Sequence, residues 1–342
     1  MNETVMKTKR KLNVGIIGLG VGEQHIAGYH NHPNCKVVPL CDFSEEKYKM
    51  AKEKYPGMKV VRDADELLND PYIDVVSIAS YDHYHYEQII RAIENDKHVF
   101  VEKPFCLFEH EAVEIRSKLI KKPYLKMSSN LVLRKSPRFM LLKEMIQEGV
   151  FGELFYLEGD YNYGRLHKIT DGWRGKMDFY SVVYGGGVHI VDLLMWVTGD
   201  TIVEVVSYGN RIVTKDTRFR FNDLNVSLLK FKSNAIAKVS ANFGCVFPHF
   251  HGLCVYGTRA TFINGMEYGM LFDSRNNSGL FKKITEPYPG VHKGALIYSF
   301  VDSILSNSQS DVMADDIFNS MSVCFAIEKA STISDKVVVQ YV

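Results

Sequence analysis

A lysine held at the end of an apolar run is the residue with the clearest chemical potential in this 342-residue chain. The run His98–Val101 has the composition of a buried strand, and Glu102, Lys103 and Pro104 follow it directly. The proline restrains the backbone of Lys103 toward extended geometry. A lysine that is partly desolvated, or close to a positive ring, is suited to accept a proton from a hydroxyl group. The pattern favours Lys103 as a proton acceptor, the alternative being a solvent-exposed lysine at a strand end.

A glycine-rich turn upstream has the pattern of a phosphate-binding loop. The segment Gly18-Leu19-Gly20-Val21-Gly22 stands between an apolar strand pattern and a helical pattern. Glycine lets a backbone approach a pyrophosphate, and the start of a helix presents N–H groups to it. Glu23 occupies the place of the third glycine in the standard motif, so we expect a shortened turn. In this context the turn predicts dinucleotide binding through Gly18, Gly20, Val21 and Gly22, although an ordinary tight turn would have similar residues.

Asp42 ends the next strand pattern, 24 residues after Gly18 (42 − 18 = 24). That spacing is typical of the acidic residue that binds the adenosine ribose of a dinucleotide. A carboxylate at this place repels a 2′-phosphate, so the sequence favours NAD over NADP. The alternative is that Asp42 belongs to the cap of the helix that starts near Ser44.

Strand and helix patterns alternate from residue 12 to about 128, which predicts an α/β Rossmann domain with a doubly wound parallel sheet. The expected strands are Leu12–Ile17, Lys36–Cys41, Val60–Val61, Val75–Ile78, His98–Val101 and Tyr124–Met127. The expected helices are Glu23–His30, Ser44–Lys54, Glu66–Asn69, His85–Asn95 and Glu109–Lys121. We assign residues 1–128 to a dinucleotide-binding domain.

The pattern changes after Asn130, where a helical segment is followed by extended segments in direct succession. Strands without intervening helices predict an α+β domain over residues 129–342, with a large, mostly antiparallel open sheet. This domain is expected to bind substrate. Apolar side chains occur on both faces of the segment Asn225–Lys232, so we expect the sheet to form a homodimer or homotetramer. The final helix, Asp315–Ser331, is expected to pack back on the first domain.

Composition excludes several classes of function. The chain has 41 basic and 40 acidic residues, so it lacks the charge excess of proteins that bind nucleic acid or anionic membranes. No apolar run has the length of a membrane span. The six cysteines contain no CxxC pair and predict reduced thiols in a cytoplasmic protein. The two His-x-His segments, at 83–85 and 249–251, are not completed by other ligands, so no metal is expected.

His189 is the second candidate for chemistry. It follows Gly185-Gly186-Gly187 at the start of an apolar helical segment. A single histidine on such a helix is often a bonded core residue. The three glycines, however, would allow a ligand to approach closely. Asp192 either orients His189 or caps backbone groups, and the sequence does not separate these roles.

Several motifs together resemble the glucose–fructose oxidoreductase / inositol dehydrogenase / MocA family over nearly the whole chain. The motifs are Glu102-Lys103-Pro104, Gly18-Leu19-Gly20, Ile78–His85, Asp171–Arg174 and Gly185–Asp192. The resemblance implies a tightly held nicotinamide cofactor and the oxidation or reduction of sugars, inositols or nucleotide sugars. It also implies that Lys103 and His189 face the reacting carbinol.

The resemblance further implies which residues contact the cofactor. These are Ser80, Tyr81, His83, His85, Glu102, Lys103 and Asn130, with Trp173 and Arg174 near the nicotinamide and the substrate. Many members have an aspartate four residues before the histidine, but here that position is Gly185. Either Tyr184 supplies a hydroxyl instead, or Lys103 acts with His189 alone. The choice between Lys103 and His189 as proton acceptor stays open.

The basic run Arg165–Lys168 would suit an anionic substrate, and Tyr163 could line a sugar site. The resulting hypothesis is an NAD-dependent dehydrogenase for a nucleotide-activated amino sugar, with Tyr163, Arg165, Arg174, His189 and Asp192 as substrate residues beside Lys103. One alternative is a dehydrogenase for a free sugar or inositol. Others are a redox-neutral enzyme that uses NAD, or a non-catalytic sensor on the same scaffold.

Overall fold

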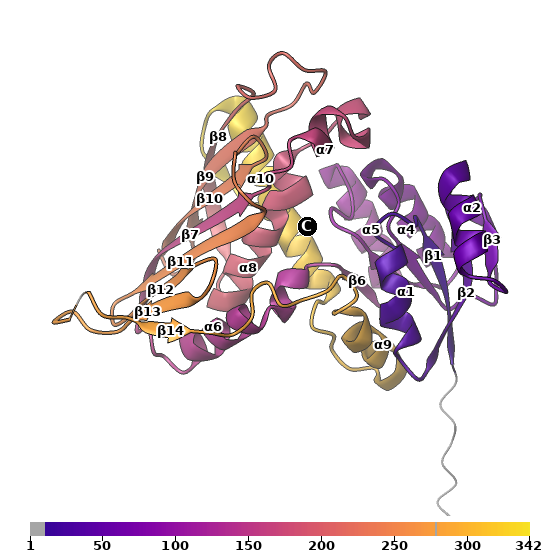
Figure 1. Ribbon diagram of the computed structural model, residues 1–342, viewed down its shortest axis with the longest axis horizontal. Coiled ribbons are helices and arrows are strands. Elements are labelled where there is room, and N and C mark those ends of the chain that lie inside the picture. The colour runs from indigo at the N-terminus through magenta and orange to yellow at the C-terminus, as the bar shows by residue number, and fades with distance from the viewer. Residues whose placement is uncertain (1–10, 278) are drawn as a thin grey trace, which may run out of the picture. The chain divides into compact units, whose positions relative to one another are not determined.

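The computed structural model describes residues 11–277 and 279–342, which divide into two compact units (Figure 1). The first unit extends to Asn130 and also includes His292–Asp315, and the second contains Leu131–Val291 and Asp316–Val342. The predicted first domain therefore begins with ten residues that lie outside the described part of the chain. Its predicted end at residue 128 falls two residues before this division.

The segment that returns to the first unit carries α9 (Ile297–Ser306). The packing of the final helix on the first domain stays a prediction. The backbone of Gly294 approaches Gly28 of α1, where an added Cβ would lie 3.2 Å from the Gly28 Cα atom. In α9, the Phe300 ring lies 5.6 Å from that of Phe100. From Asp316 on, α10 (Ala314–Ile333) belongs to the second unit.

The first unit contains a six-stranded parallel sheet in the order β3-β2-β1-β4-β5-β6, which confirms the predicted Rossmann fold. Its strands are β1 (Leu12–Ile17), β2 (Cys35–Cys41), β3 (Lys59–Val61), β4 (Val75–Ile78), β5 (His98–Val101) and β6 (Met127–Ser129). Besides α9, its helices are α1 (Glu23–His30), α2 (Glu45–Lys54), α3 (Asp65–Leu68), α4 (His85–Glu94) and α5 (Glu109–Lys121).

Buried apolar residues and helix caps explain why these segments form. Val75 and Ile78 are fully buried in β4, as expected for a strand covered on both faces. Ser44 accepts a hydrogen bond from the Lys47 N–H and so caps α2. The last strand lies farther along the chain than expected, because Tyr124 is exposed in a turn before it.

The second unit contains a nine-stranded sheet in the order β14-β13-β12-β11-β7-β10-β9-β8-β15. Among the described strands of this sheet, β7 and β10 are the one pair that runs in parallel, which confirms the predicted mostly antiparallel sheet. The strands are β7 (Leu154–Asn162), β8 (Ile202–Asn210), β9 (Leu224–Phe231), β10 (Ile236–Asn242), β11 (Phe250–Gly257), β12 (Thr261–Asn264), β13 (Gly269–Phe272), β14 (Lys282–Ile284) and β15 (Val337–Val338). With α10, the unit has helices α6 (Pro137–Gln147), α7 (His167–Thr170) and α8 (Val188–Thr198).

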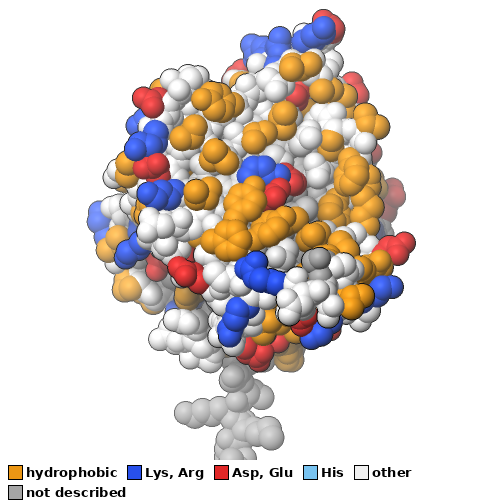
Figure 2. Space-filling model, turned by 90° about the vertical axis from the view of Figure 1, so that its left-hand side faces the viewer, with side chains coloured by type: hydrophobic (Ala, Val, Ile, Leu, Met, Phe, Trp, Pro, Cys, Tyr) orange, Lys and Arg blue, Asp and Glu red, His pale blue; other side chains and the backbone are white. Residues whose placement is uncertain are grey.

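The two faces of this sheet differ. One face packs against α8, and Gly159 of β7 permits this, since an added Cβ would lie 2.2 Å from the Ile190 side chain. On β9, Leu229 and Phe231 point to the packed face and are buried, while Val226 and Leu228 are exposed on the other. Figure 2 shows apolar side chains gathered on the exposed face.

None of the helices within residues 11–277 and 279–342 combines the length and hydropathy that crossing a bilayer requires. All six cysteines are free thiols.

Candidate active site

The glycine turn after β1 leaves its backbone open at one residue, Gly20. Gly18 has a φ of +88°, and an added Cβ would lie 2.3 Å from the Ala79 carbonyl oxygen. An added Cβ on Gly22 would lie 2.2 Å from the Gly18 carbonyl oxygen, so Gly22 allows the tight packing at the start of α1. At Gly20 no described atom lies within 4 Å of an added Cβ. The turn therefore presents the backbone of Gly20 and Val21 to a ligand, as pyrophosphate binding requires.

Asp42 ties this turn to the start of α2. One of its carboxylate oxygens accepts the Leu19 N–H at 2.7 Å, and the other accepts the Ser44 N–H at 2.9 Å. The residue thus has the structural role that the sequence left as an alternative. Each carboxylate oxygen can still accept a second hydrogen bond. The contact with a ribose stays a prediction.

Residues after β4 line the same carboxyl edge of the sheet. Ser80 donates a hydrogen bond to Gln88. The ring centroids of Tyr81 and Phe43 are 5.3 Å apart. Those of the exposed His83 and of Tyr84 are 4.0 Å apart.

His85 connects two loops of this edge. It is fully buried, and its Nδ1 and Nε2 atoms lie 2.7 Å from the Pro104 carbonyl oxygen and 3.2 Å from that of Ser80. His85 therefore holds the turn that carries the half-buried Lys103. The Lys103–Pro104 peptide bond is cis.

A buried carboxylate precedes Lys103. Glu102 accepts a hydrogen bond from Asn130 Nδ2 at 2.7 Å and one from His25 Nε2 at 3.2 Å. Burial alone would raise the pKa of Glu102, but the positive charge of Lys293 and the hydrogen bond from His25 bring the pKa below its usual range. The carboxylate is therefore ionised and can only accept hydrogen bonds.

The ionised Glu102 fixes the orientation of the Asn130 amide, since the NH₂ group must face the carboxylate. Asn130 Oδ1 is then buried without a hydrogen-bond partner among the described residues. A buried carbonyl oxygen without a partner is costly and suits a ligand with an amide donor, such as the carboxamide of nicotinamide. Together with the open backbone at Gly20, this acceptor fits a nicotinamide dinucleotide.

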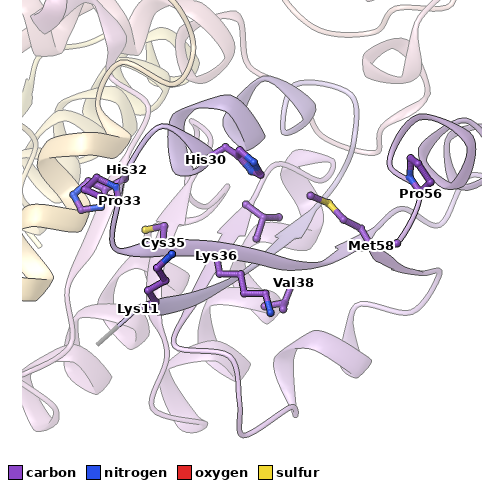
Figure 3. A pocket seen from close by; sticks show the side chains of 11 residues that line it. Lys11, His30, His32, Pro33, Cys35, Lys36, Val38, Pro56 and Met58 are labelled. Atoms are coloured by element: carbon purple, nitrogen blue, oxygen red, sulfur yellow. The ribbon is translucent and has the colours of Figure 1, made fainter. Parts of the chain in front are cut away.

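A cavity of about 650 Å³ lies elsewhere on the first unit. Figure 3 shows its lining, which includes Lys11 just before β1, His30 at the end of α1, and Cys35 and Lys36 at the start of β2. Ligands of doubly wound sheets bind at the carboxyl ends of the strands. This cavity is therefore not the candidate active site.

In the second unit, His189 lies in a cluster of aromatic rings. It follows a π-helical turn, Val183–Gly187, and is 4% exposed. Its ring stacks on Tyr161, with the centroids 6.0 Å apart and an interplanar angle of 17°. The His251 ring lies 6.2 Å away, edge-on. The cluster therefore combines aromatic and imidazole rings from β7, β11 and α8.

Two of the three glycines before His189 lie against the chain's own tyrosines, whereas we expected all three to let a ligand approach. An added Cβ on Gly185 would lie 2.1 Å from the Tyr180 hydroxyl oxygen, and one on Gly186 would lie 2.3 Å from the Tyr161 ring. An aspartate at position 185 would collide with Tyr180. The hydroxyl beside position 185 thus comes from Tyr180, while Tyr184 packs against Phe179 and Phe325.

Asp192 pairs with an arginine. Its carboxylate accepts hydrogen bonds from Arg134 Nε at 3.0 Å and Nη2 at 2.6 Å, and from Ser320 at 3.2 Å. Arg134 also lies 3.0 Å from a carboxylate oxygen of Asp316. Burial raises the pKa of Asp192, and the charge of Arg134 opposes this. The network joins α8 to α10, so the hydrogen bonds of Asp192 give it a structural role that the sequence did not indicate.

The remaining substrate candidates lie around Tyr161. Tyr163 stacks on Tyr161 at 5.9 Å, and the Arg165 guanidinium lies 5.6 Å from the centroid of the Tyr163 ring. Arg174 lies 4.5 Å from the centroid of the Trp173 ring. Burial raises the pKa of Tyr161, while the charges of Arg174 and Arg165 act in the opposite direction. Both arginines are therefore within electrostatic reach of the ring cluster.

Comparison with known families shows to which family the chain belongs. Residues 12–127 match the oxidoreductase family with an NAD-binding Rossmann fold, and residues 139–263 match the GFO/IDH/MocA C-terminal domain. The chain belongs to the Gfo/Idh/MocA family. As a member of this family it is an oxidoreductase with an NAD-binding Rossmann fold.

Individual relatives within the Gfo/Idh/MocA family are distant. The chain is 26% identical to the myo-inositol 2-dehydrogenase of Thermotoga maritima over 258 residues, which is 72% of this chain and 73% of the relative. It is 24% identical over 262 residues to the 2,7-anhydro-N-acetylneuraminate hydratase of Escherichia coli, with 73% and 66% covered. Among solved structures, levoglucosan dehydrogenase in complex with NADH and levoglucosan has a TM-score of 0.86 at 19% identity, covering 97% of this chain and all of that one.

Sequence reasoning missed several residues of this Gfo/Idh/MocA protein. His25 precedes Tyr29 by four residues on the buried face of α1, and that helical spacing is the signal that could have identified it. His251 alternates in phase with the buried Leu253 and Val255 of β11. Arg134 carries no signal of its own, because its partner Asp192 is 58 residues away.

Proposed function

We propose that this protein oxidises a secondary hydroxyl group of a free cyclic polyol or sugar. The arrangement that carries the proposal is Lys103 beside the ionised Glu102 and the unpartnered Asn130 oxygen, at the carboxyl edge of a nucleotide-binding sheet. Bound NAD supplies the acceptor for the hydride. The aromatic and imidazole rings around His189 suit a substrate with an uncharged sugar ring better than one with a diphosphate.

The substrate class differs from the one that we expected first. Arg165 and Lys168 are solvent-exposed, so the basic run on which the nucleotide-sugar hypothesis rested is explained as a solvated surface. Two relatives support a free polyol or sugar as the substrate. One is a myo-inositol 2-dehydrogenase, and the other is levoglucosan dehydrogenase in complex with levoglucosan.

In this mechanism Lys103 Nζ accepts the proton of the substrate hydroxyl as the hydride leaves. His189 and Tyr163 are the residues of the second unit that we propose for binding the sugar. Contact between carbinol and nicotinamide accounts for much of the rate.

A panel of substrates tests the proposal. Absorbance at 340 nm would be followed with NAD and either myo-inositol, scyllo-inositol, glucose, levoglucosan or UDP-N-acetylglucosamine. We expect the highest kcat/KM among the free polyols and sugars. A higher kcat/KM with the nucleotide sugar would contradict the proposed substrate class.

We also propose NAD in preference to NADP, because the Asp42 carboxylate would repel a 2′-phosphate. Asp42→Asn keeps an acceptor for the Leu19 N–H and removes the charge. The preference for NAD, measured as a ratio of kcat/KM values, should fall roughly tenfold, which corresponds to the loss of one modest charge repulsion. Asp63→Asn, at an exposed carboxylate after β3, is the matched control. An unchanged ratio in Asp42→Asn would argue against this role.

A redox-neutral reaction is the second candidate, favoured by the similarity to the anhydro-neuraminate hydratase. In such a reaction the hydride would return to the substrate after a transient oxidation. Net formation of NADH separates the two functions, because the redox-neutral enzyme would release none.

We further propose that the exposed face of the nine-stranded sheet joins copies of this chain. Leu228 and Ile236 are about half exposed there, and the rings of Tyr156 and Tyr256 stack on each other. Lys238, between Asp160 and Glu158, provides charges that a second copy could pair with. Leu228→Glu should dissociate the assembly, as measured by light scattering.

A further inference from the structure

His25 links two buried residues of the first unit, Ser77 and Glu102, through its ring nitrogens. The histidine lies on α1 and is fully buried. Its Nδ1 atom is 3.0 Å from Ser77 Oγ of β4, and its Nε2 atom is 3.2 Å from Glu102 Oε1. The ring also packs edge-on against Phe100 of β5, with the centroids 5.4 Å apart. The histidine therefore joins α1 to two neighbouring strands of the parallel sheet.

The ionised Glu102 determines which ring nitrogen of His25 carries a hydrogen. An ionised carboxylate can only accept hydrogen bonds, so His25 Nε2 must be the donor. The same carboxylate oxygen, Oε1, accepts a hydrogen bond from Asn130 Nδ2 at 2.7 Å. Two N–H groups from different parts of the fold thus converge on one oxygen of Glu102.

The contact with His25 helps to keep Glu102 ionised in spite of its burial. Burial by itself raises the pKa of Glu102, whereas the positive charge of Lys293 and the hydrogen bond from His25 lower the pKa. A protonated Glu102 could donate to the Asn130 oxygen, and the amide would no longer be held in one orientation. His25 therefore helps to keep the Asn130 NH₂ group toward Glu102 and the Asn130 oxygen away from it.

The place of Asn130 in the sheet is that expected for the nicotinamide half of a dinucleotide. Asn130 follows β6 at one edge of the sheet, whereas Asp42 follows β2 near the other edge. The glycine turn follows β1, which lies between these two strands. A dinucleotide binds across the carboxyl ends of the strands, with its pyrophosphate at the glycine turn. With the adenosine ribose at Asp42, the nicotinamide half extends toward β5 and β6.

We propose that His25 is a positioning residue for the cofactor, which through Glu102 holds the Asn130 oxygen ready to accept a hydrogen bond from the nicotinamide carboxamide. This inference rests on the part of the proposed function in which the chain binds NAD. A fixed, buried acceptor discriminates against a ring substituent without an N–H group, because the oxygen would then be left unpaired. The site should therefore prefer NAD to its 3-acetylpyridine analogue, in which a methyl group replaces the carboxamide NH₂.

The preference can be measured without any substrate. NAD and its 3-acetylpyridine analogue would each be used to displace NADH from the protein, and the loss of NADH fluorescence gives the two dissociation constants. For the unaltered protein we expect NAD to bind roughly tenfold more tightly, as for one hydrogen bond. Equal dissociation constants would overturn the proposal. No binding of NADH at all would instead overturn the proposed function.

Two variants of His25 test its part in this preference. Glutamine carries an NH₂ group near the position of Nε2 and can still donate to Glu102, whereas asparagine reaches only the position of Nδ1. His25→Asn should lower the preference from roughly tenfold to about twofold, and His25→Gln should retain most of it. His30→Asn, at an exposed histidine at the end of α1, is the matched control and should leave the preference unchanged. An undiminished preference in His25→Asn would overturn the role of His25.

Glu102→Gln tests the same orientation if His25→Asn does not fold. Glutamine has the shape of glutamate, but its amide can donate to the Asn130 oxygen as well as accept from the Asn130 NH₂ group. The Asn130 amide can then turn, so the preference should again fall to about twofold. A preference as large as that of the unaltered protein would show that Glu102 does not orient Asn130, and the proposal would fail.

Discussion

Lys103→Met should lower kcat by roughly a thousandfold, the size expected when a general base is removed. Methionine keeps the length and the apolar stem of the side chain but cannot accept a proton. The Glu102–Asn130 pair and the open turn at Gly20 do not depend on the lysine, so the affinity for NADH, measured by its fluorescence, should be nearly unchanged.

Two further variants make this result specific to proton transfer. Lys103→Arg keeps the positive charge, but an arginine does not lose its proton in a protein. It should therefore be as inactive as Lys103→Met. Lys121→Met removes an exposed lysine at the end of α5 and should behave like the unaltered enzyme. Substantial turnover by Lys103→Arg would mean that the lysine acts through its charge, and His189 would then be the better candidate for the proton acceptor.

Asp192→Ala should destabilise the second unit by about 3–5 kcal/mol, the usual cost of leaving one member of a buried ion pair without its partner. The Arg134 side chain is 7% exposed, and Asp192 accepts two of its hydrogen bonds. Both tryptophans of the chain, Trp173 and Trp196, lie in this unit. Their fluorescence during urea unfolding therefore measures the stability of the second unit alone.

Asp316→Ala is the matched control for this experiment. Asp316 contacts the same arginine, but its side chain is 25% exposed, so water can replace it and the loss of free energy should be smaller. In the double variant Arg134→Met/Asp192→Leu both fully buried charges are gone, and the partly exposed Asp316 loses only an ion pair that water can replace, so much of the lost stability should return. If Asp192→Ala were no less stable than Asp316→Ala, the ion pair would not be the anchor of α8.

The parts of the fold that the sequence predicted best are those with local signals. Val75–Ile78 and Glu109–Lys121 have the predicted bounds, because a continuous apolar run or a periodic pattern with flanking polar residues defines each. We did not predict β13, β14 or α9. The two strands are three or four residues long, so too few side chains alternate to give a pattern, and α9 lies in a segment where we expected no helix.

In the candidate site, the sequence predicted residues of a motif but not contacts that form between distant parts of the chain. Sequence identified Glu102 and Lys103 through a motif and Asn130 through the family resemblance, and the hydrogen bond between Glu102 and Asn130 agrees with their grouping. Sequence could not indicate that Tyr180 lies against Gly185, nor that Arg134 forms an ion pair with Asp192, because both contacts depend on how helices pack. The contact between His251 and Tyr288 likewise joins residues that are 37 apart in the sequence.

Transfer of deuterium from substrate to cofactor tests the central claim most directly. The polyol that gives the highest kcat/KM would be labelled with deuterium at its carbinol carbon and incubated with the enzyme and NAD. Mass spectrometry of the reduced cofactor should show one deuterium per NADH, and NADH should accumulate in equal amount to the ketone. Return of the deuterium to the sugar without accumulation of NADH would contradict the account and favour the redox-neutral reaction.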